Sequence, residues 1–118
     1  MLSMKVIYNN IIPFPGFKAI NMFGVLFVRK GCTMRETDIN HEMIHTAQMK
    51  EMGYVLYYVW YLVEWLIKLA MLRDCHKAYR AVSFEREAYT YEPNLIYLDL
   101  RNKYAWREYI VKSKILKK

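Results

Sequence analysis

The sequence has few of the residues that constrain a small protein through crosslinks or special backbone geometry. Its 118 residues include only two cysteines, four glycines and three prolines. Two cysteines, Cys32 and Cys75, do not make a disulfide framework, and the N-terminus lacks the basic, apolar and cleavage segments of a secretory signal. We therefore expect a reducing, cytoplasmic setting in which both thiols stay free.

Several motifs that would indicate a function are also missing. The chain has no internal repeat, no glycine-rich phosphate loop, no Ser/His/Asp constellation and no nucleic-acid-binding motif. Its formal net charge of +7 permits contact with nucleic acid or an anionic membrane. Part of that excess lies in a basic C-terminal tail, which we interpret as solvated: Lys112, Lys114, Lys117 and Lys118. The sequence thus predicts no specific nucleic-acid partner.

The hydrophobic content is high, at 55%, and a chain of 118 residues can build one modest core. We expect a single domain over residues 1–118. Residues 5–12 and 18–30 are predicted to be extended, because they are rich in β-branched and aromatic residues and are bounded by prolines and glycines. The patterns after them are helical. The fold class is therefore α+β, with a small N-terminal β-hairpin or two-stranded unit before a mostly helical domain.

The most informative stretch reads His-Glu-x-x-His, from His41 to His45. On a helix, histidines four residues apart lie on one face, and both imidazoles can reach one tetrahedral zinc ion. Glu42 points to the side of that ion, where it can act as general base on a water that zinc activates.

This helix should begin between Thr33 and Asp38, where capping residues stand, and end at Gly53. Apolar residues four apart predict a core-facing stripe that the histidines flank: Ile39, Met43 and Ala47.

A second motif reads Ser-Phe-Glu-Arg-Glu-Ala-Tyr, from Ser83 to Tyr89. Together the two motifs resemble the gluzincin metallopeptidases, in particular the minimal catalytic cores of the HtpX-like and ImmA/IrrE-like branches. In those families the third zinc ligand is a glutamate on a second helix. The resemblance covers residues 34–92 and implies that His41, His45 and Glu85 hold one zinc ion per chain. By the same resemblance, a strand within residues 22–29 could border the cleft and offer a free edge to a peptide, and the alternative is a strand that only packs under the helix.

Tyr89 departs from the family pattern, because those families have Asp or Asn at this position. A tyrosine cannot supply the carboxylate that would orient a ligand histidine. On a helix over residues 77–91, however, Tyr89 shares a face with Glu85. It is therefore a candidate to donate a hydrogen bond to the oxyanion of a tetrahedral intermediate, and packing between helices is the simpler alternative.

Residues 54–72 are nearly all apolar, with only Glu64 and Lys68 charged, and are as long as a bilayer span. A single span would put the histidines and Glu85 on opposite sides of a membrane, so the three-ligand site and a span exclude each other. Three antiparallel helices instead bring Glu85 level with the histidines, and residues 54–72 become the central core helix. Peripheral contact of residues 54–72 with a membrane remains an alternative. A last amphipathic helix is predicted over residues 103–116.

The leading hypothesis is a zinc-dependent metallohydrolase that cleaves peptide bonds in a peptide or protein substrate. In it Glu42 would be the general base and Tyr89 an accessory catalytic residue. One alternative is a non-catalytic zinc-binding or interaction protein of the same fold. Another is a membrane-anchored protein that uses residues 54–72. No pattern in the sequence specifies an interface between copies of the chain.

Overall fold

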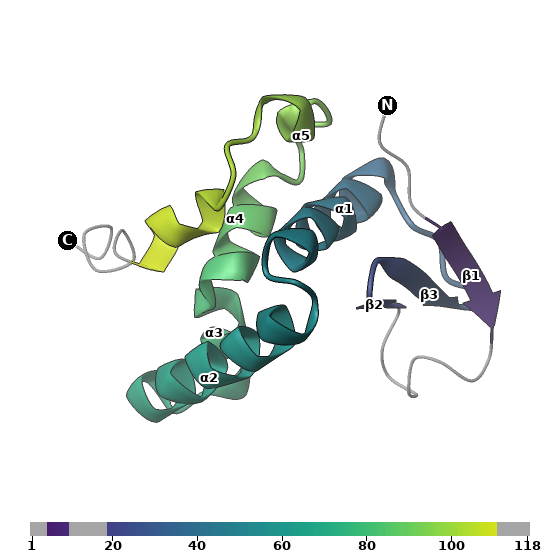
Figure 1. Cartoon of the computed structure of the whole chain (residues 1–118). Helices are drawn as coiled ribbons and strands as arrows, with labels where there is room; N and C mark the ends of the chain where they lie inside the picture. Colours follow the sequence, from purple (N-terminus) through teal and green to yellow (C-terminus); the bar gives the residue numbers. More distant parts are fainter. Residues whose placement is uncertain (1–4, 10–18, 111–118) are drawn as a thin grey trace.

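The computed structural model describes residues 5–9 and 19–110, and it has the predicted α+β architecture. A small sheet lies at one end of the molecule and the helices occupy the rest, with helix α1 between the sheet and the other helices (Figure 1).

The sheet contains three strands, β1 (Lys5–Asn9), β2 (Ala19–Met22) and β3 (Val25–Arg29), in the order β1-β3-β2. The two predicted extended segments do pair, but as β1 parallel to β3, and the antiparallel hairpin of β2 and β3 lies within the second segment, so the sheet has three strands where two were expected. The hairpin turn is Phe23-Gly24, with φ of 53° and 91°. Two consecutive positive φ values suit a two-residue turn that matches the twist of the strands.

The pairing contradicts one expectation drawn from the resemblance. β3 is the central strand and pairs over Val25–Arg29 with β1 and over Val25–Val28 with β2. It has no free edge for a peptide, so the role predicted for residues 22–29 is wrong for β3.

Helix α1 spans Glu36–Glu51 and begins within the predicted range. The Asp38 carboxylate accepts a hydrogen bond from the backbone N–H of Arg35, at 3.0 Å, and so satisfies one of the N–H groups that lack a partner at the start of the helix. Gly53, with φ of 67°, follows the helix as predicted. Helix α2 then runs over Val55–Leu72.

The predicted single helix over residues 77–91 is two helices, α3 (Cys75–Ala81) and α4 (Ser83–Tyr91). They are separated by Val82, whose backbone is extended. Glu64 of α2 stabilises this break, because its carboxylate accepts hydrogen bonds at 2.7 Å from both the N–H and the hydroxyl of Ser83. The glutamate-bearing helix is therefore capped by the apolar helix.

Two short helices follow, α5 (Tyr97–Leu100) and the 3₁₀ helix η1 (Ala105–Arg107). Trp106 of η1 is buried and packs its ring edge-on against Phe84, with centroids 4.7 Å apart. This agrees with the core role predicted for the C-terminal helix, of which residues 111–116 lie outside the described residues.

Two expectations about the core are wrong. The buried face of α1 is not the predicted stripe, whose members are only half-buried, but the face that carries both histidines with Ile44, Gln48 and Met49. α4 packs on that face. Nor is α2 a central core helix, since Tyr57 is its only buried residue. The larger hydrophobic cluster lies where α1, α2, α4 and η1 meet: Met49, Tyr57, Val82, Phe84 and Trp106.

Candidate metal centre

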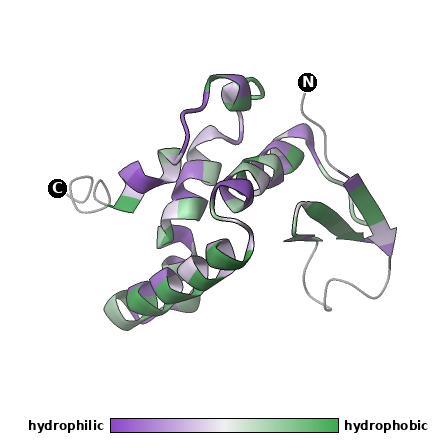
Figure 2. Cartoon of the chain, viewed as in Figure 1, coloured by the Kyte–Doolittle hydropathy of each residue, from purple (hydrophilic) through white to green (hydrophobic). Residues whose placement is uncertain are grey.

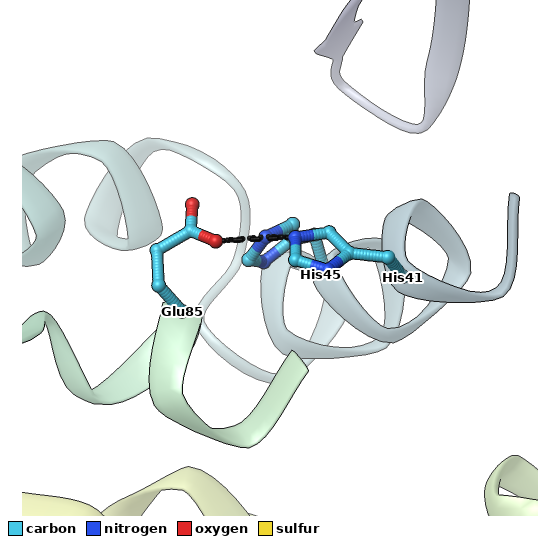
Figure 3. A group of neighbouring side chains, drawn as sticks. All are labelled: His41, His45 and Glu85. Carbon is cyan, nitrogen blue, oxygen red and sulfur yellow. Dashed lines mark hydrogen bonds and ion pairs between the residues drawn. The ribbon is translucent and has the colours of Figure 1, made fainter. Parts of the chain in front are cut away.

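Three predicted ligands meet between α1 and α4. His41 and His45 project from α1, and Glu85 reaches them from the first turn of α4 (Figure 3). The Nε2 atoms of the two histidines are 3.1 Å apart, and each lies 3.1 Å from Oε1 of Glu85. All three residues are buried and could hold a metal ion.

The spacing of these atoms fits a tetrahedral ion. Zinc bound by nitrogen and oxygen at about 2.0 Å has its ligand atoms about 3.3 Å apart. The observed triangle, 3.1 Å on every side, is close to that value. Two imidazoles and one carboxylate are also a usual donor set for zinc that keeps a fourth position open.

The second nitrogen of each histidine is held by an oxygen acceptor. Nδ1–H of His41 donates to Oε1 of Glu92 at 2.8 Å, and Nδ1–H of His45 donates to Oε1 of Gln48 at 2.8 Å. In neutral imidazoles this places both Nε2 lone pairs at the centre, facing the Glu85 oxygen. Three acceptors at this separation repel one another unless a cation or a proton lies between them.

The pKa values of His45 and Glu85 are shifted in the direction that keeps a proton between these acceptors. Burial lowers the pKa of His45, but the Glu85 carboxylate outweighs burial and raises it to about 9. Burial raises the pKa of Glu85, while the charge of His45 and hydrogen bonds from both histidines lower it well below its usual value. In the metal-free protein at neutral pH, His45 therefore keeps a proton where a metal would bind.

Glu92 was not predicted as a site residue. It follows the last residue of α4 and supplies the carboxylate that the family pattern places at position 89. Asn40 of α1 fixes this chain end, because its side-chain nitrogen lies 3.2 and 2.9 Å from the carbonyl oxygens of Tyr91 and Glu92. Two turns after Glu85, a glutamate returns to the same helix face, and that spacing is the signal that could have identified it.

Tyr89 lies beside the site without reaching its centre. Its ring packs edge-on against the ring of His41, with centroids 4.5 Å apart, and its hydroxyl is 2.7 Å from that of Tyr79. The guanidinium of Arg80 lies over the Tyr89 ring, 3.7 Å from its centroid. The catalytic role of Tyr89 stays a prediction.

Two other tyrosines, both on α2, contact the ligands directly. The Tyr61 hydroxyl donates to Oε2 of Glu85 at 2.7 Å, which leaves Oε1 to face the histidines. The Tyr57 hydroxyl lies 3.3 Å from Nδ1 of His45. Sequence analysis missed both, although phenol groups one turn apart in an otherwise apolar helix mark a side that has polar partners.

Glu42, the predicted general base, is half-buried on α1. Burial raises the pKa of its carboxyl, and the charges of His45 and His41 partly offset that rise. Asn21 of β2 holds the sheet against this turn of α1 by donating to the carbonyl of Glu42 at 3.0 Å and to the Thr46 hydroxyl at 3.1 Å. The hairpin is therefore fixed beside the candidate base.

Glu87, the second glutamate of the downstream motif, has a structural role. It is fully buried and accepts hydrogen bonds from Arg101, from Tyr97 at 2.6 Å and from Gln48 at 2.9 Å. Arg101 also pairs with Glu51 at 2.7 Å. Since the Gln48 amide nitrogen is committed to Glu87, its oxygen must face His45, which connects the buried ion pair to the orientation of a metal ligand.

No family model, curated protein or solved structure matches the chain. The description of the site therefore rests on its own geometry and on the two motifs.

Proposed function

We propose that the chain is a zinc-dependent hydrolase of the gluzincin type, acting on peptide bonds. One observation carries the proposal: Nε2 of His41, Nε2 of His45 and Oε1 of Glu85 form a triangle with 3.1 Å sides. Each of these groups is also held by a hydrogen bond on its outer side. Such preorganisation toward a single point is what a catalytic metal needs.

Zinc held by these ligands would supply a Lewis acid that polarises a carbonyl and acidifies a water. Glu42 would accept a proton from the attacking water and return it to the leaving amine. Its raised pKa brings it closer to neutral pH, where a general base is most effective. Tyr89 could donate to the developing oxyanion if its hydroxyl accepts the hydrogen bond from Tyr79, which leaves its own proton available.

The sheet supports a peptide as the substrate. Within the described ranges β2 pairs with no strand other than β3, so an extended chain could add to its other edge if it displaced the Tyr58 hydroxyl, which donates to the Asn21 carbonyl at 3.4 Å. Because Asn21 of β2 is hydrogen-bonded to Glu42, a peptide added to that edge would run past the candidate base.

A non-catalytic metal site is the second candidate, and the burial of the ligands favours it. His41, His45 and Glu85 expose only 7%, 4% and 5% of their surface. A catalytic ion must be reached by substrate, whereas a structural ion is closed off.

The first test is zinc content by elemental analysis of wild type, of Glu85→Ala and of Glu36→Ala, an exposed control on α1. We expect about one zinc per chain in wild type and in the control, and a marked loss in Glu85→Ala. A wild type that stays empty after reconstitution with zinc would rule out both candidates.

The second test separates the two candidates. Wild type and Glu42→Gln, both loaded with zinc, are incubated with fluorescein-labelled casein. Hydrolysis by wild type that is lost in Glu42→Gln supports the peptidase. No hydrolysis by either protein at full zinc content supports the structural site, and equal hydrolysis by both rejects Glu42 as the base.

A further inference from the structure

Helix α2 has an apolar surface that no described residue covers. We call it the outer face of α2. It contains residues that are exposed although they are large and hydrophobic: Val55, Leu56, Val59, Trp60, Leu62, Val63, Leu66, Ile67 and Met71. Figure 2 shows α2 at the edge of the molecule, coloured mainly green for hydrophobic residues and interrupted by paler and purple stretches. A monomeric soluble protein rarely exposes an apolar patch larger than a few hundred Å².

The polarity of α2 is inverted relative to a helix on the surface of a soluble protein. Its polar groups face the protein, where Glu64 caps α4 and Tyr61 binds Glu85. The outer face carries no charged side chain. The hydropathy of the helix is high enough for a membrane span, and only 6% of it is buried.

The width of the outer face argues against a simple helix pair as its cover. At 100° per residue, a narrow stripe along its middle contains Leu56, Val59, Val63 and Leu66. A two-stranded coiled coil buries such a stripe and places charged residues on both sides of it. Here the flanking positions are also apolar, since they are Val55 and Leu62 on one side and Trp60 and Ile67 on the other.

We propose that the outer face of α2 binds the surface of a lipid bilayer, with the helix lying in the plane of the interface. A helix with one wide apolar side and an opposite polar side inserts in this way. The chain carries a net charge of +7, which favours a membrane with anionic lipids. Exposed basic residues follow the helix at Arg73 and Lys77, where they can reach head groups.

The contacts of the inner side exclude a spanning orientation. Glu64 and Tyr61 tie α2 to α4, and α3 packs along α2 with Lys77 and Arg80 exposed. A span would pull these charged groups into hydrocarbon, where each is strongly unfavourable. In the interfacial orientation they stay on the aqueous side together with the metal ligands.

Vesicle flotation of the full chain tests this proposal. Vesicles of phosphatidylcholine with a minority of phosphatidylglycerol are mixed with wild type, with Val59→Glu/Leu66→Glu, and with Ile96→Glu/Leu100→Glu. The first pair lies on the outer face, at 51% and 49% exposure, and the control pair lies near α5, at 61% and 68% exposure. Both pairs add the same two charges at exposed apolar positions.

We expect wild type and the control variant to float with the vesicles, and the outer-face variant to lose at least an order of magnitude in bound fraction. Circular dichroism establishes that each variant is folded. Trp60 fluorescence gives a measurement on wild type itself. Its emission should shift to shorter wavelength when vesicles are added, and Trp60→Phe, which lacks this emission, is the control. Neither readout depends on hydrolysis, so failure of the proposed function would leave this result unchanged.

Three results would overturn the proposal. Wild type could stay in the aqueous fraction, or all variants could float alike. A stable lipid-free oligomer that only the outer-face variant dissociates would show that a second copy of the chain covers the face instead.

Discussion

The hydrogen bond between Glu92 and His41 allows a quantitative test of the metal centre. Nδ1 of His41 and Oε1 of Glu92 are 2.8 Å apart, and the Glu92 side chain is 25% exposed. A carboxylate at this position fixes the tautomer of a ligand histidine and makes its other nitrogen a stronger donor. Removing such a partner weakens metal binding by roughly 10- to 100-fold, or about 1.4 to 2.7 kcal/mol.

The substitutions Glu92→Gln and Glu92→Ala separate charge from geometry. Glutamine keeps an oxygen that can accept from Nδ1–H but loses the charge, so zinc affinity should fall near the lower end of that range. Alanine removes the acceptor, and the loss should approach the upper end. Partial exposure of Glu92 lets water replace part of the lost interaction, which limits the effect of both changes.

The assay is competition for zinc against a chromophoric chelator at constant pH, with Glu36→Gln as the control on an exposed glutamate. Tyr89→Asp completes the set, since it places a carboxylate where the gluzincin pattern has one. If Glu92 already orients His41, Tyr89→Asp should not tighten zinc binding. Wild-type affinity in Glu92→Ala, or a tighter Tyr89→Asp, would refute the assigned role of Glu92.

Three further predictions concern the surroundings of the ligands. Tyr61→Phe removes the 2.7 Å hydrogen bond to Glu85, and the same chelator assay should show zinc affinity reduced by about 1 to 2 kcal/mol. Arg101→Met leaves the fully buried Glu87 without its cation, and chemical denaturation should show a loss of about 3 to 5 kcal/mol, with an unchanged midpoint contradicting the ion pair. In the metal-free protein the raised pKa of His45 contributes stability that is complete below about pH 6.5 and is lost toward pH 9, so Tm should fall over this window. Zinc affinity should rise over the same pH window, because zinc displaces that proton. If neither Tm nor zinc affinity changed between these pH values, His45 would be excluded as the titrating group.

The histidine pair could be predicted from local spacing, whereas Glu85 was identified by the resemblance of its motif to a family pattern. Residues i and i+4 share a helix face in any α-helix, so the pairing of His41 with His45 needs no knowledge of the fold. The return of Glu85 to the same level followed from helix lengths, and it remained correct although Val82 divides the predicted helix into two. An error in one element boundary did not displace a ligand that stands one turn after the break.

The supporting contacts could not be predicted in the same way, since they depend on which faces of the helices meet. Spacing places Glu92 on the helix face of Glu85, but its contact with His41 also depends on how the end of α4 meets α1, where Asn40 holds it. The predicted apolar stripe of α1 was wrong for a related reason. Hydrophobic spacing identified a face that is only half-buried. The packed face is instead rich in polar groups whose hydrogen-bond partners lie mostly on α4 and the residues after it: Asn40, His41, His45 and Gln48. Composition alone does not reveal a buried face whose polar atoms are paired.

The prediction that α2 is the central core helix was wrong because contacts with the site determine which side of this helix faces the protein. An apolar helix was expected to bury its hydrophobic residues, but Tyr61 and Glu64 must face inward to reach Glu85 and Ser83. These two contacts fix the rotation of the helix about its axis, and the remaining residues then point outward. Rotating α2 to bury Val59 and Val63 would remove the hydroxyl that orients the third ligand and the cap that starts its helix. The exposed apolar face is therefore a consequence of how the candidate metal centre is built, and a lipid surface would allow both to persist in one small domain.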